Sequence, residues 1–325
     1  MRPFIRAVKS DKMGVRILRR LPLDGLQGPI DDQPVRISAA STLIADERHL
    51  WIFSDDRLVL HKLDWNTLSV SLFPLQPDGG SVPLSKAIKP DWEAATWVSP
   101  KPPERRLLFM GSGSRPQRME IGLLSITEEG MLSLRRFPVP HLYDKLAHAL
   151  APEGELNIEG VVWKPDTDEL LLFQRGTAHY PNAIGTISWP TVEYCLTDPE
   201  RSASILFESV QFYDLGQVRG VPLAFTDATW HPQKGLFYVA AAEDTSDAYE
   251  DGLILGSVIG WFAPDGKPYF ASLSDERGNP VPIKVEGIAP DPAHLNRFFL
   301  ITDPDEPCCP SELLWVHIEG LERYS

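Results

Sequence analysis

Five related phrases along the chain place an acidic or hydroxyl side chain inside an apolar run. The clearest are "DWEAATW" at 91–97, "NIEGVVW" at 157–163 and "KVEGIAP" at 284–290, each with glutamate as its third residue. "AFTDATW" at 224–230 and the weaker "RISAAST" at 36–42 complete the set. Aligning the phrases gives one column of third residues, with Asp227 one place later in the fourth phrase: Ser38, Glu93, Glu159, Thr226 and Glu286.

A carboxylate inside an apolar run is costly unless something pairs with it. Each phrase is followed by a short apolar strand, and polar residues come directly after that strand: Asp55 and Asp56, Ser112 and Arg115, Gln174 and Arg175, Glu243 and Asp244, Asp303 and Asp305. Several carboxylates gathered in one place cannot all stay ionised without cations to offset them. Carboxylate oxygens are ligands that Ca²⁺ and Mg²⁺ prefer, so the pattern predicts a divalent cation site.

These residues together predict a metal-assisted hydrolase that acts on a small anionic substrate of the phosphoester or lactone type, without an organic cofactor. The cation polarises the substrate or activates water, and the expected ligands are Glu93, Glu159, Glu286, Asp303 and Asp227. The expected substrate-binding residues are Arg115, Arg175, Gln174 and Ser112. The two arginines bind the substrate's anionic group through bidentate hydrogen bonds. Glu243 or Asp244 acts as general base. Replacing Arg175 with alanine should then abolish ligand binding at little cost in stability.

Two alternatives stay open at this level. A glutamate repeated in every unit can accept backbone N–H groups from the neighbouring unit and so join the units together. The whole protein can also be a non-catalytic β-propeller that binds a small ligand or a protein partner on one face.

The elements that carry these residues repeat every 55–67 residues as four short strands bounded by turn residues. This pattern predicts an all-β chain folded as a single β-propeller of five four-stranded blades, spanning residues 1–325. Six blades are the alternative, if a long connection hides another sheet. The blades fall near residues 36–80, 91–145, 157–216, 224–275 and 284–320. The last lacks a fourth strand, which residues 14–23 supply, and a helix is expected only at 141–150.

The composition narrows the possible partners. The chain has 325 residues, 43% of them hydrophobic, and a net charge of −14, so nucleic acid and anionic membranes are unfavourable partners. Neither a signal peptide nor a run of about 18 apolar residues is evident. Three cysteines, Cys195, Cys308 and Cys309, form a poor disulfide framework and favour a reducing, cytoplasmic location. Cys195 is expected to be a small buried apolar residue.

Two resemblances accompany this reading. "NIEGVVW" resembles the "EGPVW" phrase of the lactonase family related to senescence marker protein, which implies that Glu159 is a metal ligand. A broader resemblance is to bacterial proteins of the esterase-like, phytase-related propeller group and an uncharacterised family beside it. It rests on stretches across most of residues 30–318, namely "LNIEG", "LLFQRG", "FTDATW", "AAEDT", "DGLILGS", "KVEGI" and "ITDPDEP". It implies a propeller fold without assigning chemistry.

Overall fold

The computed structural model describes residues 4–28, 34–76, 84–85, 88–99, 103–198, 205–244, 252–306 and 309–324. Strands make up most of the regular structure, which confirms the mostly β chain expected from the sequence. Cys308 and residues 77–80, at the end of the first predicted blade, lie outside the described residues. Within the described residues, the helices are all too short to cross a membrane.

The first three groups of strands form separate antiparallel sheets in sequence order. Sheet one contains β6 (Ala40–Ala45), β7 (His49–Ser54), β8 (Val59–Asp64) and β9 (Val70–Pro74). Sheet two contains β10 (Trp92–Ser99), β11 (Glu104–Gly111), β12 (Glu120–Thr127) and β13 (Leu132–Pro138). Sheet three contains β14 (Ile158–Lys164), β15 (Glu169–Gln174), β16 (Asn182–Ser188) and β17 (Ser209–Asp214), with β1 (Phe4–Arg6) added in parallel at the edge of β17.

The remaining strands form one larger sheet that joins the N- and C-terminal parts of the chain. Its first half contains β19 (Val221–His231), β20 (Gly235–Asp244), β21 (Leu253–Phe262) and β22 (Pro268–Ser274). Its second half contains β23 (Val285–Pro290), β24 (Arg297–Thr302), β25 (Glu312–Glu319) and β3 (Gly14–Pro22). β3 runs antiparallel to β25 over its full length and meets β22 in parallel over two residues.

Four two-residue strands complete the β structure. β2 (Val8–Lys9) lies parallel to β22, and β18 (Gln217–Val218) forms a hairpin with β19. β4 (Leu26–Gln27) pairs with β5 (Pro34–Val35). The N-terminal segment therefore pairs with the outer strands of the third and fourth groups, β17 and β22, and supplies the outer strand of the last group as β3.

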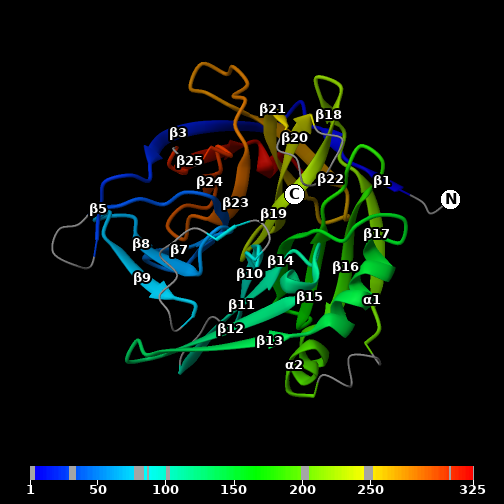
Figure 1. The fold of residues 1–325 in the computed structure, drawn as a ribbon. Coiled ribbons are helices and arrows are strands. Elements are labelled where there is room, and N and C mark those ends of the chain that lie inside the picture. Colours follow the sequence, from blue (N-terminus) through cyan, green and yellow to red (C-terminus); the bar gives the residue numbers. More distant parts are fainter. Residues whose placement is uncertain are drawn as a thin grey trace.

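The first strand of each four-stranded group lies toward the middle of the molecule (Figure 1). We call β6, β10, β14, β19 and β23 the inner strands. Each inner strand packs against the next in sequence order, and β23 packs against β6. Because strands alternate in direction within each group, the start of each inner strand lies at the same end of its sheet as the end of the second strand.

Aromatic side chains from second strands fill the spaces between neighbouring groups. Phe53 of β7 lies 4.9 Å from Phe109 of β11, measured between ring centroids, and Phe237 of β20 lies 4.6 Å from Phe298 of β24. All four rings are fully buried. Packed aromatic pairs of this kind contribute about 0.5–1.5 kcal/mol beyond their area burial. The core is thus distributed between the groups, and it holds the inner strands in fixed relative positions.

Two helices cover the outside of the third group. α1 (Pro140–Leu150) confirms the helix expected at 141–150. α2 (Trp189–Thr197) was not predicted, although its buried residues Trp189, Val192, Cys195 and Leu196 follow the helical period. α2 begins directly after the last residue of β16, so its first residues resemble the continuation of a strand in the sequence. Cys195 is buried, as expected. Two 3₁₀ helices, η1 (Pro116–Arg118) and η3 (Leu321–Tyr324), are short.

Candidate functional site

Every inner strand contains a β-bulge. The register skips one residue between Trp92 and Ala94 in β10, and the same break occurs in β14 and β23. The skipped residues are Glu93, Glu159 and Glu286. A bulged residue is unpaired in the ladder, and bulges often re-aim a side chain next to a functional site. The bulge therefore explains how glutamates can occur in strands that are otherwise apolar and buried.

The bulges also correct the alignment of the first phrase. In β6 and β19 the skipped residues are Ser41 and Thr226, so Ser41, not Ser38, belongs to the column. Ser41 donates a hydrogen bond from Oγ to the Trp92 carbonyl, and Thr226 donates from Oγ1 to the Val285 carbonyl at 2.6 Å. Ser41 and Thr226 thus join neighbouring inner strands. Joining the units is the structural alternative that the sequence left open for the whole column.

A cavity of about 400 Å³ lies at the side of the molecule where the inner strands begin. Among the described residues, its wall carries twice as many acidic as basic side chains. The acids are Asp55, Asp56, Asp91, Glu93, Glu155, Glu159, Glu286, Asp303, Asp305 and Glu306; the bases are Arg57, Lys89, Arg118, Arg175 and Lys284. Like charges in a space of this size raise one another's pKa or bind counter-ions.

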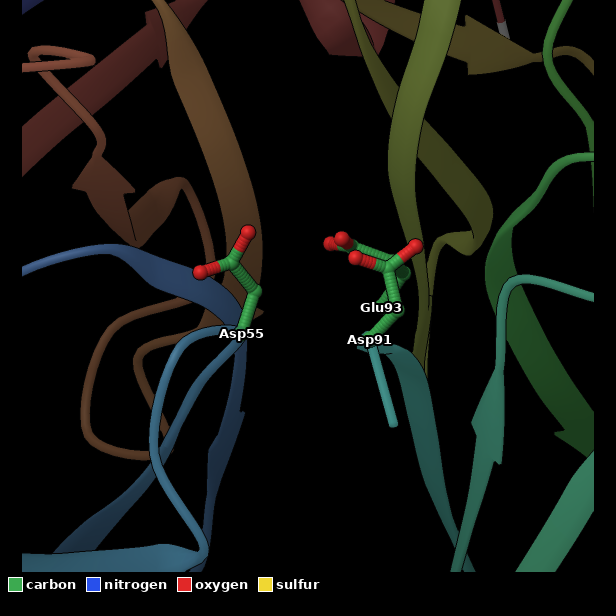
Figure 2. Close-up of side chains that lie close together, drawn as sticks. All are labelled: Asp55, Asp91 and Glu93. Carbon is green, nitrogen blue, oxygen red and sulfur yellow. The ribbon is translucent and has the colours of Figure 1, made fainter. Parts of the chain in front are cut away.

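One group of three carboxylates in this wall has the spacing of a metal site. The ligand oxygens of Asp55, Asp91 and Glu93 lie within 4.8 Å of one another. Figure 2 shows Asp91 and Glu93 side by side at the start of β10, with Asp55 opposite them at the end of β7. We call these three residues the acidic triad. Lys89 forms ion pairs with two of them: with Asp55, and with Asp91 at 3.0 Å.

Asp91 is the most firmly held member of the acidic triad. Its Oδ2 accepts hydrogen bonds from Ser112 Oγ and from Arg118 Nη1, each at 2.6 Å. Its backbone has a positive φ of 56°, an uncommon conformation that costs energy for residues other than glycine. Ala39 and Asp305, which also line the cavity, have positive φ as well. Strained backbone tends to gather at functional sites, and three of the six described non-glycine residues with positive φ line this one cavity.

Lys284 is the basic centre of a second carboxylate cluster. Its Nζ lies 3.0 Å from both Glu286 and Asp305, and 3.7 Å from Glu243. Although burial lowers the pKa of Lys284, the neighbouring carboxylates, Glu286 foremost, leave it well above its usual value. Arg175 bridges two acids in the same way, with Nη1 at 3.2 Å from Glu159 and Nη2 at 2.7 Å from Glu243.

Several carboxyl groups in the cavity favour their protonated forms. Burial raises the pKa of Glu159 to about 7, although Arg175 acts in the opposite direction. Burial also raises the pKa of Asp303 to about 7, and Asp305 adds to the effect. The pKa of Glu93 lies well above its usual range because of burial and the charge of Asp91. Among the described residues, Glu286 Oε2 is buried without a hydrogen-bond partner.

Five of the predicted site residues line the cavity: Glu93, Glu159, Glu286, Asp303 and Arg175. Three others support lining groups. Ser112 holds Asp91, and Glu243 holds Arg175 and accepts from the Gly252 N–H at 2.8 Å. Gln174 bonds to three backbone groups around Asn157 and Arg175.

The remaining three predicted residues do not line the cavity. Arg115 is exposed. The arginine that this loop contributes to the wall is Arg118, three residues later, because η1 turns the loop between them. Asp244 is exposed at the end of β20. Asp227 accepts from the Ala228 and Ile288 N–H groups at 2.7 and 2.9 Å, so it joins β19 to β23. These contacts indicate that Asp227 joins two inner strands and is not a ligand-binding residue.

Lys89, Asp91, Arg118, Asn157 and Lys284 are cavity residues that the sequence analysis did not single out. A signal for three of them was present. Asp91, Asn157 and Lys284 each stand two residues before a column glutamate, and each directly precedes the first residue of an inner strand. Asn157 donates to Glu159 Oε1 at 2.6 Å. Lys89 and Arg118 come from loops of unrelated length, and the repeat contains no sign of them.

A family model matches residues 36–318, well over half of the chain. The chain belongs to the family of unknown function DUF6929. No curated protein sequence is similar to this DUF6929 member.

Solved structures with a similar fold share little sequence with it. The calcium-binding protein regucalcin from Agrobacterium tumefaciens is 10% identical, with 97% of both chains covered and a TM-score of 0.43. The major Malassezia sympodialis allergen Mala s 1 is 8% identical over 90% of this chain and 95% of its own, with a TM-score of 0.49. Streptogramin B lyase is 11% identical over 92% and 98%, with a TM-score of 0.37. At these identities and TM-scores the likenesses say nothing about activity.

We expect the pKa of Asp303 to be visible in stability. A carboxyl group whose folded-state pKa is raised stabilises the fold below its unfolded-state pKa, near 4, and this stabilisation is lost as the pH rises through about 7. Residue 303 does not titrate in an Asp303→Asn variant. With chelator present, the melting temperature of the variant minus that of the native protein should therefore rise by roughly 2–5 °C between about pH 5 and about pH 8. Buried histidines such as His61 titrate in both proteins and cancel in the comparison. A constant difference across this range would show that Asp303 is ionised throughout.

Proposed function

We propose that the four-stranded groups are the five blades of one propeller, with β3 as the fourth strand of the last blade. The ring of contacts between inner strands and the long ladder between β3 and β25 support this arrangement. In a propeller the cavity at the start of the inner strands is the mouth of the central channel, where ligands commonly bind.

We propose that this cavity binds a divalent cation, Ca²⁺ or Mg²⁺, and that the bound cation serves the hydrolysis of a small phosphoester or lactone. The observation that carries the proposal is the excess of carboxylates over basic groups in the cavity wall, together with the unpartnered Glu286 Oε2. Oxygen-rich sites of this kind suit hard divalent cations. The ligands we propose are the acidic triad, with Glu159, Glu286 and Asp303 facing the same space. When bound, the cation would polarise the substrate or lower the pKa of a water molecule.

The roles of the other groups differ from the sequence-based assignment. Arg175 is engaged by Glu159 and Glu243, so the substrate's anionic group is better placed on the cation than on this guanidinium. Glu243 is held by Arg175 and a backbone N–H, and Asp244 is exposed. Glu159 also contacts Arg175, but unlike Glu243 and Asp244 it lines the cavity, and burial raises its pKa to about 7. A catalytic base works best when its pKa lies near the working pH, so Glu159 replaces them as the proposed general base.

A second candidate is a non-catalytic propeller that binds a cation or a cationic ligand. One observation favours it: each of the five basic residues in the wall forms an ion pair with an acid, as with Arg57 and Asp56. A site for an anionic substrate would be expected to present basic groups that are less fully engaged. This candidate predicts cation binding without turnover.

The test is calorimetric titration of chelator-treated protein with Ca²⁺ and Mg²⁺. We expect Glu286→Gln and Glu93→Gln to weaken binding by at least about tenfold, because each removes one anionic ligand. Asp244→Asn makes the same change in charge on an exposed residue and should leave affinity unchanged. Failure of both ions to bind would overturn the proposal. Cation binding without hydrolysis of any phosphoester, lactone or carboxylester in a screen would favour the second candidate.

We also propose that the protein acts in the cytoplasm, with a small anionic ligand as its partner and without nucleic acid or membrane partners. The acidic composition disfavours nucleic acid and anionic membranes, and a cavity of about 400 Å³ has the size of a small-molecule site. A protein partner on an outer face is the alternative, and co-purification from cells would reveal it.

A further inference from the structure

Lys89 lies where a cation bound by the acidic triad would lie. The triad's ligand oxygens lie within 4.8 Å of one another, and Lys89 Nζ forms ion pairs with Asp55 and Asp91. The Lys89 side chain is only 11% exposed, so water screens its charge weakly. A divalent cation on the same oxygens would be a few ångströms from the ammonium. Like charges at that distance in a buried site repel strongly.

We infer that Lys89 is a built-in counter-ion that a divalent cation must displace, and that it makes the acidic triad selective for divalent over monovalent cations. This inference rests on the proposed cation site. A tethered ammonium already neutralises Asp55 and Asp91 with one positive charge. A monovalent ion gains nothing by replacing it, because it brings the same charge and must give up its own water. A divalent ion brings twice the charge to the same oxygens.

The second lysine of the cavity differs in a way that provides a comparison. Lys284 pairs with Glu286, Asp305 and, more distantly, Glu243. Among the described residues, the acidic triad is the only group of three potential ligands with metal-site spacing, so Lys284 does not fill such a site. Glu286 lines the same cavity as the triad, and its Oε2 has no hydrogen-bond partner. The two lysines are thus similarly buried, but only Lys89 contacts carboxylates that have metal-site spacing.

The variant Lys89→Met tests the inference, because methionine keeps the length of the side chain and removes its charge. We expect Ca²⁺ affinity to rise by at least about tenfold, and added K⁺ to compete with Ca²⁺ more strongly than it does in the native protein. Lys284→Met and Arg57→Met remove a positive charge from the same wall outside the triad, and they measure the general effect of charge. Arg57 is a second control in case Lys284→Met fails to fold. Equal gains in all three variants would overturn the inference and leave the cation site standing.

A direct measurement on the native protein does not depend on folding of the variants. Reductive methylation followed by mass spectrometry reports whether each lysine amine is accessible. We expect Ca²⁺ to increase the labelling of Lys89 by several-fold and to leave Lys284 unchanged, since only Lys89 leaves its carboxylates. Protection of Lys89 that persists in saturating Ca²⁺ would overturn displacement. If Ca²⁺ binds to neither the native protein nor Lys89→Met, both the inference and the proposed function fail. Binding by Lys89→Met alone would support the lysine's role and overturn the native cation site.

Discussion

An Arg175→Ala variant is expected to lose about 3–5 kcal/mol of unfolding free energy, because removal of one partner from a buried ion pair leaves the other charge uncompensated. The guanidinium contacts Glu159 and Glu243, whose side chains are 5% and 6% exposed. Both carboxylates would have to take up protons or admit water. This expectation reverses the one drawn from sequence, in which Arg175 was held free for a ligand and its loss cost little stability.

The measurement is thermal and denaturant unfolding at neutral pH, where a loss of this size lowers the melting temperature by on the order of 5–10 °C. Arg115→Ala is the matched control: it removes an exposed arginine and should change the unfolding free energy by less than about 0.5 kcal/mol. Adding Glu243→Gln to Arg175→Ala should recover part of the loss, because one stranded charge is removed. If Arg175→Ala melts like the native protein, Arg175 is not the counter-ion of these acids.

Ile17→Asp is expected to have the second large effect, a loss of at least about 4 kcal/mol and of most soluble protein. Ile17 is 5% exposed on β3 and pairs with Val316 of β25. A buried aspartate there would detach β3 and expose the edge of β25, with its buried residues Leu314, Val316 and Ile318. The effect is large because total stabilities are only about 5–15 kcal/mol.

Leu18→Asp is the matched control for this variant. Leu18 is the next residue along β3 but is 36% exposed, and it lies at the register break opposite Trp315 and Val316. The same substitution there should cost less than about 1 kcal/mol, measured as melting temperature and as the soluble fraction after expression. Similar behaviour of the two variants would mean that the ladder between β3 and β25 contributes little to the fold.

The strands could be predicted from sequence because each carries its own signal. Runs such as "ELLLFQ" at 169–174 are apolar, branched and bounded by turn residues, and they form strands wherever the fold places them. The four-strand repeat was predicted from such runs, and the helix at 141–150 was predicted from its helical spacing of apolar residues. The short helix at 189–197 was missed because its nine residues directly continue a strand.

The candidate site was predictable only in the part that repeats. Glu93, Glu159 and Glu286 share a column and reach one cavity because a bulge recurs at the same point of each inner strand. A bulge depends on how two strands pair and leaves no fixed mark in one sequence. This is why Ser38 was aligned in place of Ser41. The ion pairs of Asp91 could not be predicted either. Its partners Lys89 and Arg118 come from loops whose lengths vary, and they meet Asp91 only in the folded chain.

The pairing of β3 with β25 has a consequence for synthesis of the chain. A ribosome makes residues 14–22 about 290 residues before their partner, residues 312–319. At about 5–20 residues per second, the interval is on the order of 15–60 s. Throughout that time Val15 and Ile17, both buried in the finished protein, lack their partners in β25. The nascent protein must therefore carry β3 unpaired with β25 until residues 312–319 have been made, and during that interval chaperones and proteases can reach it.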